Sequence, residues 1–312
     1  MNSALRLTFA ALLTVAVSAH AKIERTVEKT FAVNGAGLLR AETFGGAIRV
    51  TPGADQQVRV VVKQTIKADT DAQADELLKK LDLTLEQEGN DVRLMAKYER
   101  APSGFRWGSW PPVQVAFEVT VPASFATKLS TSGGGITVGD LAGKAEAHTS
   151  GGAIKLGRMG GEVRAHTSGG SIALASASGP ATLKTSGGNI SAGPVAGAAD
   201  FSTSGGNIKV DSVIGAVRAH TSGGSVSATI AGPLKEDCSL ATSGGSVRVA
   251  VDRAAAFRLD AVTSGGGVDA SGLTITLEKT SRDRSRLAGA VNGGGPLLKL
   301  RTSGGSISVR TE

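Results

Sequence analysis

The chain has 312 residues, of which 43 are glycine, about twice the share of an average globular protein. Its 34 basic and 27 acidic residues give a net charge of +7, a mild excess spread along the chain that does not indicate a nucleic-acid partner. Glycine does not recur at every third position, which excludes collagen. Aromatic residues make up only 4% of the chain, which argues against a compact enzyme with a wide aromatic-lined pocket.

Residues 1–21 are predicted to be an export signal. Arg6 supplies a short positive region, residues 7–17 form an apolar stretch, and residues 19–21 read Ala-His-Ala, a cleavage site of the A-x-A type. The apolar stretch is too short to span a bilayer, which takes ~20 residues. We therefore expect a mature chain that begins near Lys22, has no transmembrane segment, and is exported to the periplasm, the cell surface or the extracellular space.

Residues 22–125 are predicted to form a first coil and a β-rich capping region. Residues 39–50 place apolar side chains around a glycine pair in the same pattern as the later repeat, which predicts the first coil. Strands are predicted at 58–66, 83–85, 92–95 and 113–121, and a helix over 71–81 with Asp69 or Thr70 as its cap. Because open strand edges invite association, we expect this region to cover one end of the repeat.

Residues 126–312 contain the tetrapeptide Thr-Ser-Gly-Gly nine times. The first six copies, from Thr131 to Thr221, are spaced by 18 residues, and the last three begin at Thr242, Thr263 and Thr302. Apolar residues alternate with polar ones on both sides of each copy, which indicates short strands with one buried face and an inward threonine. This periodicity predicts an all-β fold, a parallel β-solenoid of ~18-residue, two-strand coils with a thin aliphatic core.

The Ser-Gly-Gly of each copy is expected to form a turn, where glycine permits positive φ and lets neighbouring coils pass closely. Residues 271–295 interrupt the period and are expected to fold over the end that carries the final coil. The handedness of the coil stays open, although parallel crossovers favour right-handed turns. The turn glycines of the first six copies are Gly133, Gly134, Gly151, Gly152, Gly169, Gly170, Gly187, Gly188, Gly205, Gly206, Gly223 and Gly224.

Several motifs together carry a family resemblance. They are Thr-Phe-Gly-Gly-Ala-Ile-Arg-Val at 43–50, Val-Pro-Ala-Ser at 121–124, the serial Thr-Ser-Gly-Gly-x-Ile/Val units, and the glycine-rich closing segment at 289–295 with its final unit. In this combination the mature chain resembles the bacterial putative-adhesin family of β-strand repeats. The resemblance implies an exported, envelope-associated β-solenoid, and it supplies no catalytic residues.

The sequence offers no convincing catalytic motif. Serine recurs in the same turn of all nine units, which favours a turn role over a catalytic triad. Residues 139–145 resemble a phosphate loop, but their glycines are one residue too close and Ala145 stands where a hydroxyl would meet magnesium. The repeat turns also lack the aspartate of calcium-binding β-rolls, and no column collects the acidic and basic residues that a polysaccharide lyase needs. We therefore predict a non-enzyme without cofactor or metal.

Two arginine-containing segments are candidates for partner contact. Trp107 and Trp110 lie beside Arg106 and two prolines, a combination common in binding hot spots, although the segment could instead plug the first coil. The densest basic run is expected to be a solvated loop or a contact for anionic glycan or lipid. This run contains Arg282, Arg284 and Arg286.

Two further features have plain structural interpretations. His148 and His166 are predicted to share an outward column on adjacent coils, where a solvated ladder is favoured over a metal site because no acid completes a ligand set. Cys238, the single cysteine, falls in an inward column and is predicted to be a small core residue.

These observations predict an exported, non-enzymatic β-solenoid that serves the cell envelope as an adhesin or as a scaffold and interaction protein. Its partner would be a glycan, an anionic lipid or a protein of the envelope or cell surface. Two alternatives stay open. One is a carbohydrate-active enzyme of the lyase or hydrolase type on a β-helix, and the other is a regulatory component that responds to envelope stress.

Overall fold

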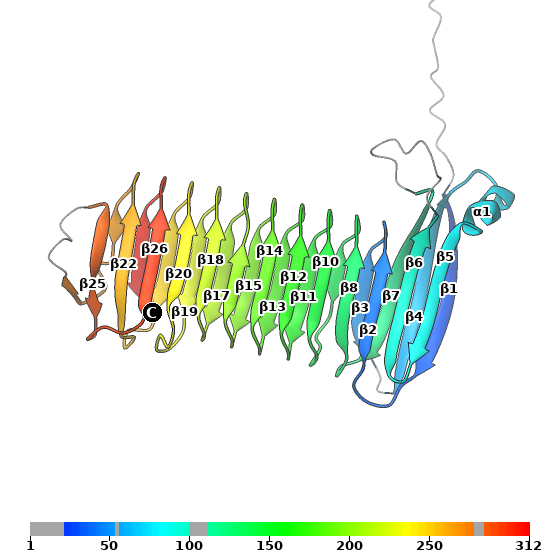
Figure 1. Ribbon diagram of the computed structural model, residues 1–312, viewed down its shortest axis with the longest axis horizontal. Helices are drawn as coiled ribbons and strands as arrows, with labels where there is room; N and C mark the ends of the chain where they lie inside the picture. Colours follow the sequence, from blue (N-terminus) through cyan, green and yellow to red (C-terminus); the bar gives the residue numbers. More distant parts are fainter. Residues whose placement is uncertain (1–21, 54–55, 100–110, 278–283) are drawn as a thin grey trace, which may run out of the picture.

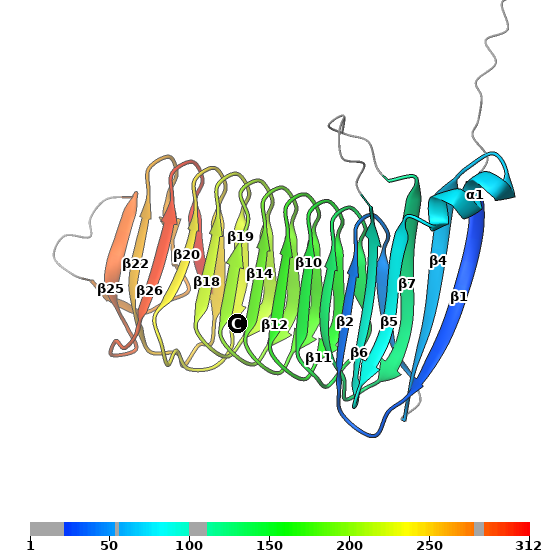
Figure 2. The same cartoon turned by 45° about the vertical axis from the view of Figure 1, so that its right-hand side comes forward.

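Two long β-sheets face each other over the length of the molecule (Figures 1 and 2). The computed structural model describes residues 22–53, 56–99, 111–277 and 284–312, so the predicted export signal lies outside the described residues. These residues form 27 strands and one helix, and the strands of the repeat pair in parallel with their counterparts in neighbouring coils. The predicted parallel β-solenoid with a β-rich cap and one short helix is confirmed.

Each coil contributes one strand to each sheet. The 13-stranded sheet A contains, in spatial order, β1 (Lys22–Ala32), β4 (Gln57–Lys67), β7 (Val113–Pro122), β3 (Ile48–Gly53), β9 (Ile136–Val138), β11 (Ile154–Met159), β13 (Ile172–Ala177), β15 (Ile190–Val195), β17 (Ile208–Val213), β19 (Val226–Ile230), β21 (Val247–Val251), β27 (Ile307–Thr311) and β23 (Val268–Asp269). The 14-stranded sheet B contains β24 (Ile275–Leu277), β25 (Arg286–Val291), β22 (Phe257–Thr263), β26 (Leu297–Thr302), β20 (Cys238–Thr242), β18 (Val217–Thr221), β16 (Ala199–Ser202), β14 (Ala181–Thr185), β12 (Val163–Thr167), β10 (Ala145–Thr149), β8 (Ala126–Thr131), β2 (Leu38–Thr43), β6 (Asp91–Tyr98) and β5 (Leu81–Glu88).

The core is a narrow aliphatic layer between the two sheets. Inward side chains stack on their own kind from coil to coil, as Ile136, Ile154 and Ile172 do at adjacent positions in sheet A. All three are at most 1% exposed. Burial of one face of the repeat strands is the main stabilising contribution, and it explains the alternating sequence pattern. Cys238 is buried in this layer, as predicted, and burial raises the pKa of its thiol.

The N-terminal end is covered by strands that lie outside the repeat. The β2–β3 coil has the repeat on one side, and β6 and β7 on the other. β5 then pairs with β6, and β4 and β1 extend sheet A. Helix α1 (Asp71–Leu78) lies at this end, capped by Thr70 as predicted. Its predicted end at 81 was wrong, because Leu81 pairs with Tyr98 in the β5–β6 hairpin.

Strand β1 was not predicted. Its pairing with β4 places Arg25 opposite the buried Gln64, and Lys29 opposite the buried Val60. These two cations therefore occupy the inward column, where the sequence pattern leads one to expect apolar residues. Arg25 is neutralised by α1, since its guanidinium lies 3.0 Å from the carboxylates of both Asp71 and Asp75.

The repeat threonines form a buried hydrogen-bonded ladder. Each hydroxyl donates to the carbonyl of the second turn glycine in the adjacent coil, as Thr167 Oγ1 does to Gly152 O at 2.8 Å. The same hydroxyl accepts from the second glycine of its own turn, as Thr167 does from Gly170 N at 3.2 Å. A buried backbone group without a partner is costly, so the threonine satisfies two groups that the turn would leave unpaired. The contact recurs from Thr131 to Thr302.

Replacing Thr167 by valine is expected to lower the free energy of unfolding by about 1–3 kcal/mol. Valine keeps the shape of the side chain but leaves Gly152 O and Gly170 N without their hydrogen-bond partner. Thr167→Ser is the control, since it retains the hydroxyl and removes only a methyl group. Urea titration of the two variants measures the difference. Equal losses in the valine and serine variants would contradict a role for the hydrogen bonds.

Of the two expected reasons for the turn glycines, positive φ was wrong and the close passage of neighbouring coils is confirmed. None of the repeat glycines has positive φ; the described glycines with left-handed φ lie elsewhere, for example Gly232 at 73°. The second glycine is required by close packing instead. A Cβ on Gly152 or Gly170 would lie 2.0 Å from the carbonyl oxygen of the second glycine in the adjacent coil. The turns therefore stack backbone against backbone.

The order of the last coils also corrects the prediction. The C-terminal strands β26 and β27 do not end the stack: β26 lies between β20 and β22, and β27 lies between β21 and β23. In chain order, the β22–β23 coil therefore comes before the β26–β27 coil, but in the stack the β26–β27 coil lies between it and the β20–β21 coil. β24 and β25 of the predicted covering segment lie outside β22, so they cover that coil and not the final one.

Candidate functional site

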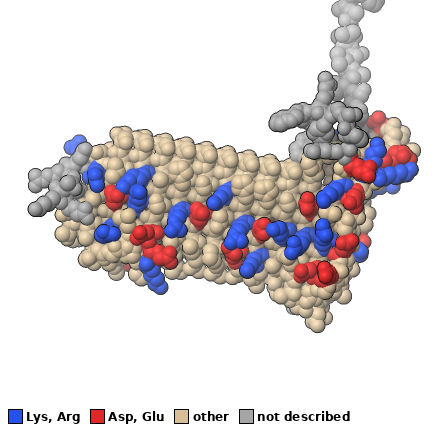
Figure 3. Space-filling model, viewed as in Figure 1, with Lys and Arg blue, Asp and Glu red and all other residues tan. Residues whose placement is uncertain are grey.

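The outer face of sheet B carries charged side chains in columns that cross the strands. Because the strands are in register, residues three positions before each repeat threonine follow one another across the sheet. We call these residues the central column, together with Arg40 and Arg93, which continue the line on β2 and β6. Figure 3 shows basic and acidic groups intermixed in a band along the molecule. From the N-terminal end the central column contains Arg93, Arg40, Lys128, Glu146, Arg164, Thr182, Asp200, Arg218, Ser239, Lys299 and Asp260.

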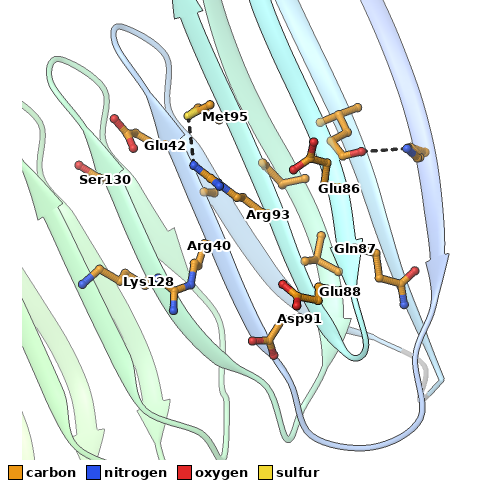
Figure 4. Close-up of a pocket in the computed structure, with 15 residues that line it drawn as sticks. Arg40, Glu42, Glu86, Gln87, Glu88, Asp91, Arg93, Met95, Lys128 and Ser130 are labelled. Carbon is orange, nitrogen blue, oxygen red and sulfur yellow. Dashed lines mark hydrogen bonds between the residues drawn. The ribbon is translucent and has the colours of Figure 1, made fainter.

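A groove of about 880 Å³ lies at the N-terminal end of this face, where β5, β6, β2 and β8 run side by side (Figure 4). We call it the sheet B groove. Its lining is mostly polar and mixes both signs of charge. The polar residues and the methionine that line it are Lys29, Arg40, Glu42, Glu86, Gln87, Glu88, Asp91, Arg93, Met95, Lys128 and Ser130.

Several charges of the groove already have partners. Lys29 Nζ donates to Leu85 O at 2.9 Å and lies over the Phe31 ring. Lys128 Nζ is 3.0 Å from a carboxylate oxygen of Glu146 on β10. Asp91 Oδ1 accepts from Leu38 N at 2.9 Å, which ties β6 to the start of β2.

The two arginines of the groove are differently placed. Among the described residues, the one polar contact of the Arg93 guanidinium is a 3.9 Å contact from Nη2 to Met95 Sδ. Within the described part of the chain, no hydrogen bond or ion pair engages the Arg40 guanidinium. Both side chains are exposed, so the groove presents two guanidinium groups whose N–H donors can bind an anion.

The histidine pair stands in the neighbouring column of sheet B, as predicted. The rings of His148 and His166 are stacked, with centroids 5.1 Å apart and planes 6° from parallel, and Lys184 follows on the next strand. Partial burial, together with the positive charges of His148 and Lys184, lowers the pKa of His166. Among the residues that the structure describes, no group of three metal-ligating side chains converges here or elsewhere.

His166 is expected to titrate below the ordinary histidine pKa of ~6.5. Because its folded-state pKa is depressed, its contribution to stability is present above the unfolded-state value and is lost as the pH falls through the folded-state value. Lys184→Gln should raise the pKa of His166, whereas Lys155→Gln, on sheet A, should leave it unchanged. NMR titration of the ring protons measures this, and a His166 pKa above the ordinary value would contradict it.

The residues predicted for partner contact are only partly within the described chain. Arg106, Trp107, Trp110 and Arg282 lie outside the described residues. Arg284 precedes β25 and Arg286 is the first residue of β25; both are exposed, at the end of the solenoid opposite the groove (Figure 1). The structure therefore does not bring these two arginines to the groove.

Sequence reasoning missed the groove for an identifiable reason. Arg40 and Lys128 both stand three residues before a repeat-type threonine, Thr43 and Thr131, so their adjacency could have been found by aligning the columns. Arg93 lies in the capping region, which follows no repeat. Its register against Arg40 depends on the pairing of β6 with β2.

The sequence and structure were compared with known proteins. The family model of the Toastrack DUF4097 proteins matches residues 45–310. A putative adhesin from Bacteroides fragilis NCTC 9343 is 13% identical with a TM-score of 0.42, over 91% of this chain and 97% of that chain. A putative lipid binding protein from Parabacteroides distasonis ATCC 8503 is 16% identical with a TM-score of 0.34, over 91% and 96%. A putative cell adhesion protein from Clostridium sporogenes ATCC 15579 is 12% identical with a TM-score of 0.27, over 92% and 100%.

No curated protein matches the chain. Within the described ranges, no helix is long and apolar enough to cross a membrane.

Proposed function

We propose that this chain, which belongs to the Toastrack DUF4097 family, is an exported, non-enzymatic interaction protein of the cell envelope that acts as an adhesin or scaffold. The observation that carries the proposal is the long face of sheet B, where charged side chains stand in register on a rigid stack. Support for export comes from the sequence pattern of residues 1–21.

The geometry suits contact over a large area. Thirteen spacings between the 14 strands of sheet B, at ~4.8 Å each, give a face roughly 62 Å long. The threonine ladder and the stacked turns hold this face in one conformation, so binding would order few groups. Such a face can present the same side-chain spacing repeatedly to a polymer or to a neighbouring protein.

Two outlying segments are proposed as additional contacts. One contains Arg106, Trp107 and Trp110, whose aromatic rings could stack on sugar faces. The other contains Arg282, Arg284 and Arg286, and its arginines, of which Arg284 and Arg286 are exposed, could meet anionic glycan or lipid head groups. Substitution of each segment separately distinguishes their contributions from that of the sheet face.

Affinity capture from envelope extract tests the proposed function. The purified protein is immobilised, and the variants are Trp107→Ala/Trp110→Ala and Arg284→Ala/Arg286→Ala. We expect a reproducible envelope component that is recovered chemically unchanged. Recovery of nothing specific would contradict the proposal. Release of cleaved saccharide would favour the carbohydrate-active alternative, and capture of one membrane protein that responds to envelope stress would favour the regulatory one.

A further inference from the structure

The central column of sheet B contains one run of like charges. Arg40 of β2 pairs in register with Arg93 of β6 on one side and with Lys128 of β8 on the other. Everywhere else in the column, a charged residue has a neighbour of opposite sign or a neutral one. This holds from Glu86 opposite Arg93 at one end to Asp260 opposite Lys299 at the other.

This run is unfavourable in the protein alone. Like charges directly opposite each other on adjacent strands destabilise a sheet, and here three follow in succession at ~4.8 Å per strand. The two outer cations have acidic neighbours, since Glu146 is 3.0 Å from Lys128 and Glu86 lies opposite Arg93, but no ion pair among the described residues engages Arg40 between them. Local arrangements that depart from the rules of sheet stability are expected at functional sites.

The same three cations line the sheet B groove. Arg93 and Arg40 lie on the neighbouring strands β6 and β2 and line the groove (Figure 4), and Lys128 of β8 lies at its margin with its side chain directed toward Glu146 of β10. Guanidinium groups bind carboxylate, phosphate or sulfate through paired hydrogen bonds. The run of like charge and the groove are separate observations, and they coincide at one place on the sheet.

The acids around the cations restrict the ligand. Glu42 lies two residues beyond Arg40 along β2, and Asp91 lies two residues before Arg93 along β6, so carboxylates flank the cations on both sides. A flat anionic membrane would bring many phosphates against this acidic rim at once, whereas a single anionic group on a glycan can reach the arginines within it. Hydroxyl groups, in contrast, can donate to it, and Ser130 adds a further polar group.

We propose that the sheet B groove binds an anionic group of an acidic glycan, with Arg40 and Arg93 as the forks that hold it and Lys128 beside them. This inference rests on the proposed envelope function and names the ligand class of one site on that face. The anionic group is a carboxylate, phosphate or sulfate, and the hydroxyls of the adjoining sugars meet the acidic rim.

Binding of defined saccharides tests the groove. The probes are a hexamer of galacturonate and maltohexaose with and without one phosphate, titrated by calorimetry at 0.15 M salt. We expect at least one charged probe to bind at least tenfold more tightly than neutral maltohexaose. Arg40→Ala/Arg93→Ala should weaken that binding at least tenfold. The control, Arg49→Ala/Arg248→Ala, removes two exposed arginines of sheet A, on the opposite side of the solenoid, and should change it less than twofold.

Equal losses in the two double variants, or no binding of any charged probe, would overturn the proposal. So would binding to phosphatidylglycerol vesicles through the same arginines without binding to the saccharides. Thermal unfolding gives an independent readout: Arg40→Gln should raise the unfolding temperature by removing repulsion, whereas Arg218→Gln, opposite Asp200, should not. If Arg40→Ala/Arg93→Ala still captures the envelope component, the groove assignment fails and the proposed function stands.

Discussion

Replacing Gly152 by alanine is expected to lower the free energy of unfolding by about 3 kcal/mol or more. The added Cβ would lie 2.0 Å from the carbonyl oxygen of Gly134 in the adjacent coil, and backbone on both sides leaves nothing flexible to move away. Coils must therefore separate locally, which also lengthens the hydrogen bond from Thr149 to Gly134. Urea unfolding monitored by circular dichroism measures the loss.

Gly151→Ala is the matched control. It adds the same methyl group to the same turn, but its nearest neighbour is 3.6 Å away, an ordinary contact. Since φ of Gly151 is not left-handed, the substitution should change the free energy of unfolding by no more than about 1 kcal/mol and can stabilise by restricting the unfolded chain. Similar losses in the two variants would contradict close backbone stacking as the reason for the second glycine.

Ending the chain at Gly295 is expected to unfold the outermost coil, β22–β23, while the rest of the stack persists. The deletion removes β26 and β27, which lie between the β20–β21 and β22–β23 coils. It also removes the fully buried Leu298, Leu300 and Ile307. Coils in a solenoid depend on their neighbours, so β22 and β25 lose their support. Hydrogen exchange of residues 257–263 should rise to the level of an unfolded segment.

The order of the coils determines this result. If the final coil lay at the outer end, its deletion would leave β22 paired with β20 and protected from exchange, which would contradict the structure. Disulfide trapping provides a control in the full chain. Ser239→Cys/Lys299→Cys joins residues that pair directly and should cross-link. Ser239→Cys/Asp260→Cys joins residues two strands apart and should not.

The repeat made most of the fold predictable. Alternation around Thr-Ser-Gly-Gly placed the threonines inward and the isoleucine columns in the core, and both are buried. It could not reveal why glycine is needed, because close passage of a carbonyl depends on the spacing of coils and not on the local sequence. Positive φ, the local explanation, was wrong for these turns.

The position of the final coil could not be predicted for a related reason. The unit at Thr302 follows the same pattern as the others, so its columns fit equally well at the end of the stack or inside it. Only the pairing of Leu300 with both Leu240 and Ala261 distinguishes the two arrangements. Local pattern determines which face of a strand is buried, and it does not determine which coil lies beside which.

The candidate site was less predictable than the fold. The sequence drew attention to unusual residues, the tryptophans and the dense arginine run. The groove instead consists of ordinary charged residues from segments around positions 40, 93 and 128 that become adjacent only in the sheet. The groove stands out because three basic residues follow one another in the central column, and this run can be recognised only when the strand register is known.

Saturable binding of the labelled protein to isolated cell envelopes tests the central claim most directly. We expect binding that saturates, that excess unlabelled protein displaces, and that leaves the envelope glycans uncleaved. Uptake that rises linearly with concentration and is not displaced, or release of saccharide fragments during binding, would contradict the assignment of this solenoid as a non-enzymatic interaction protein.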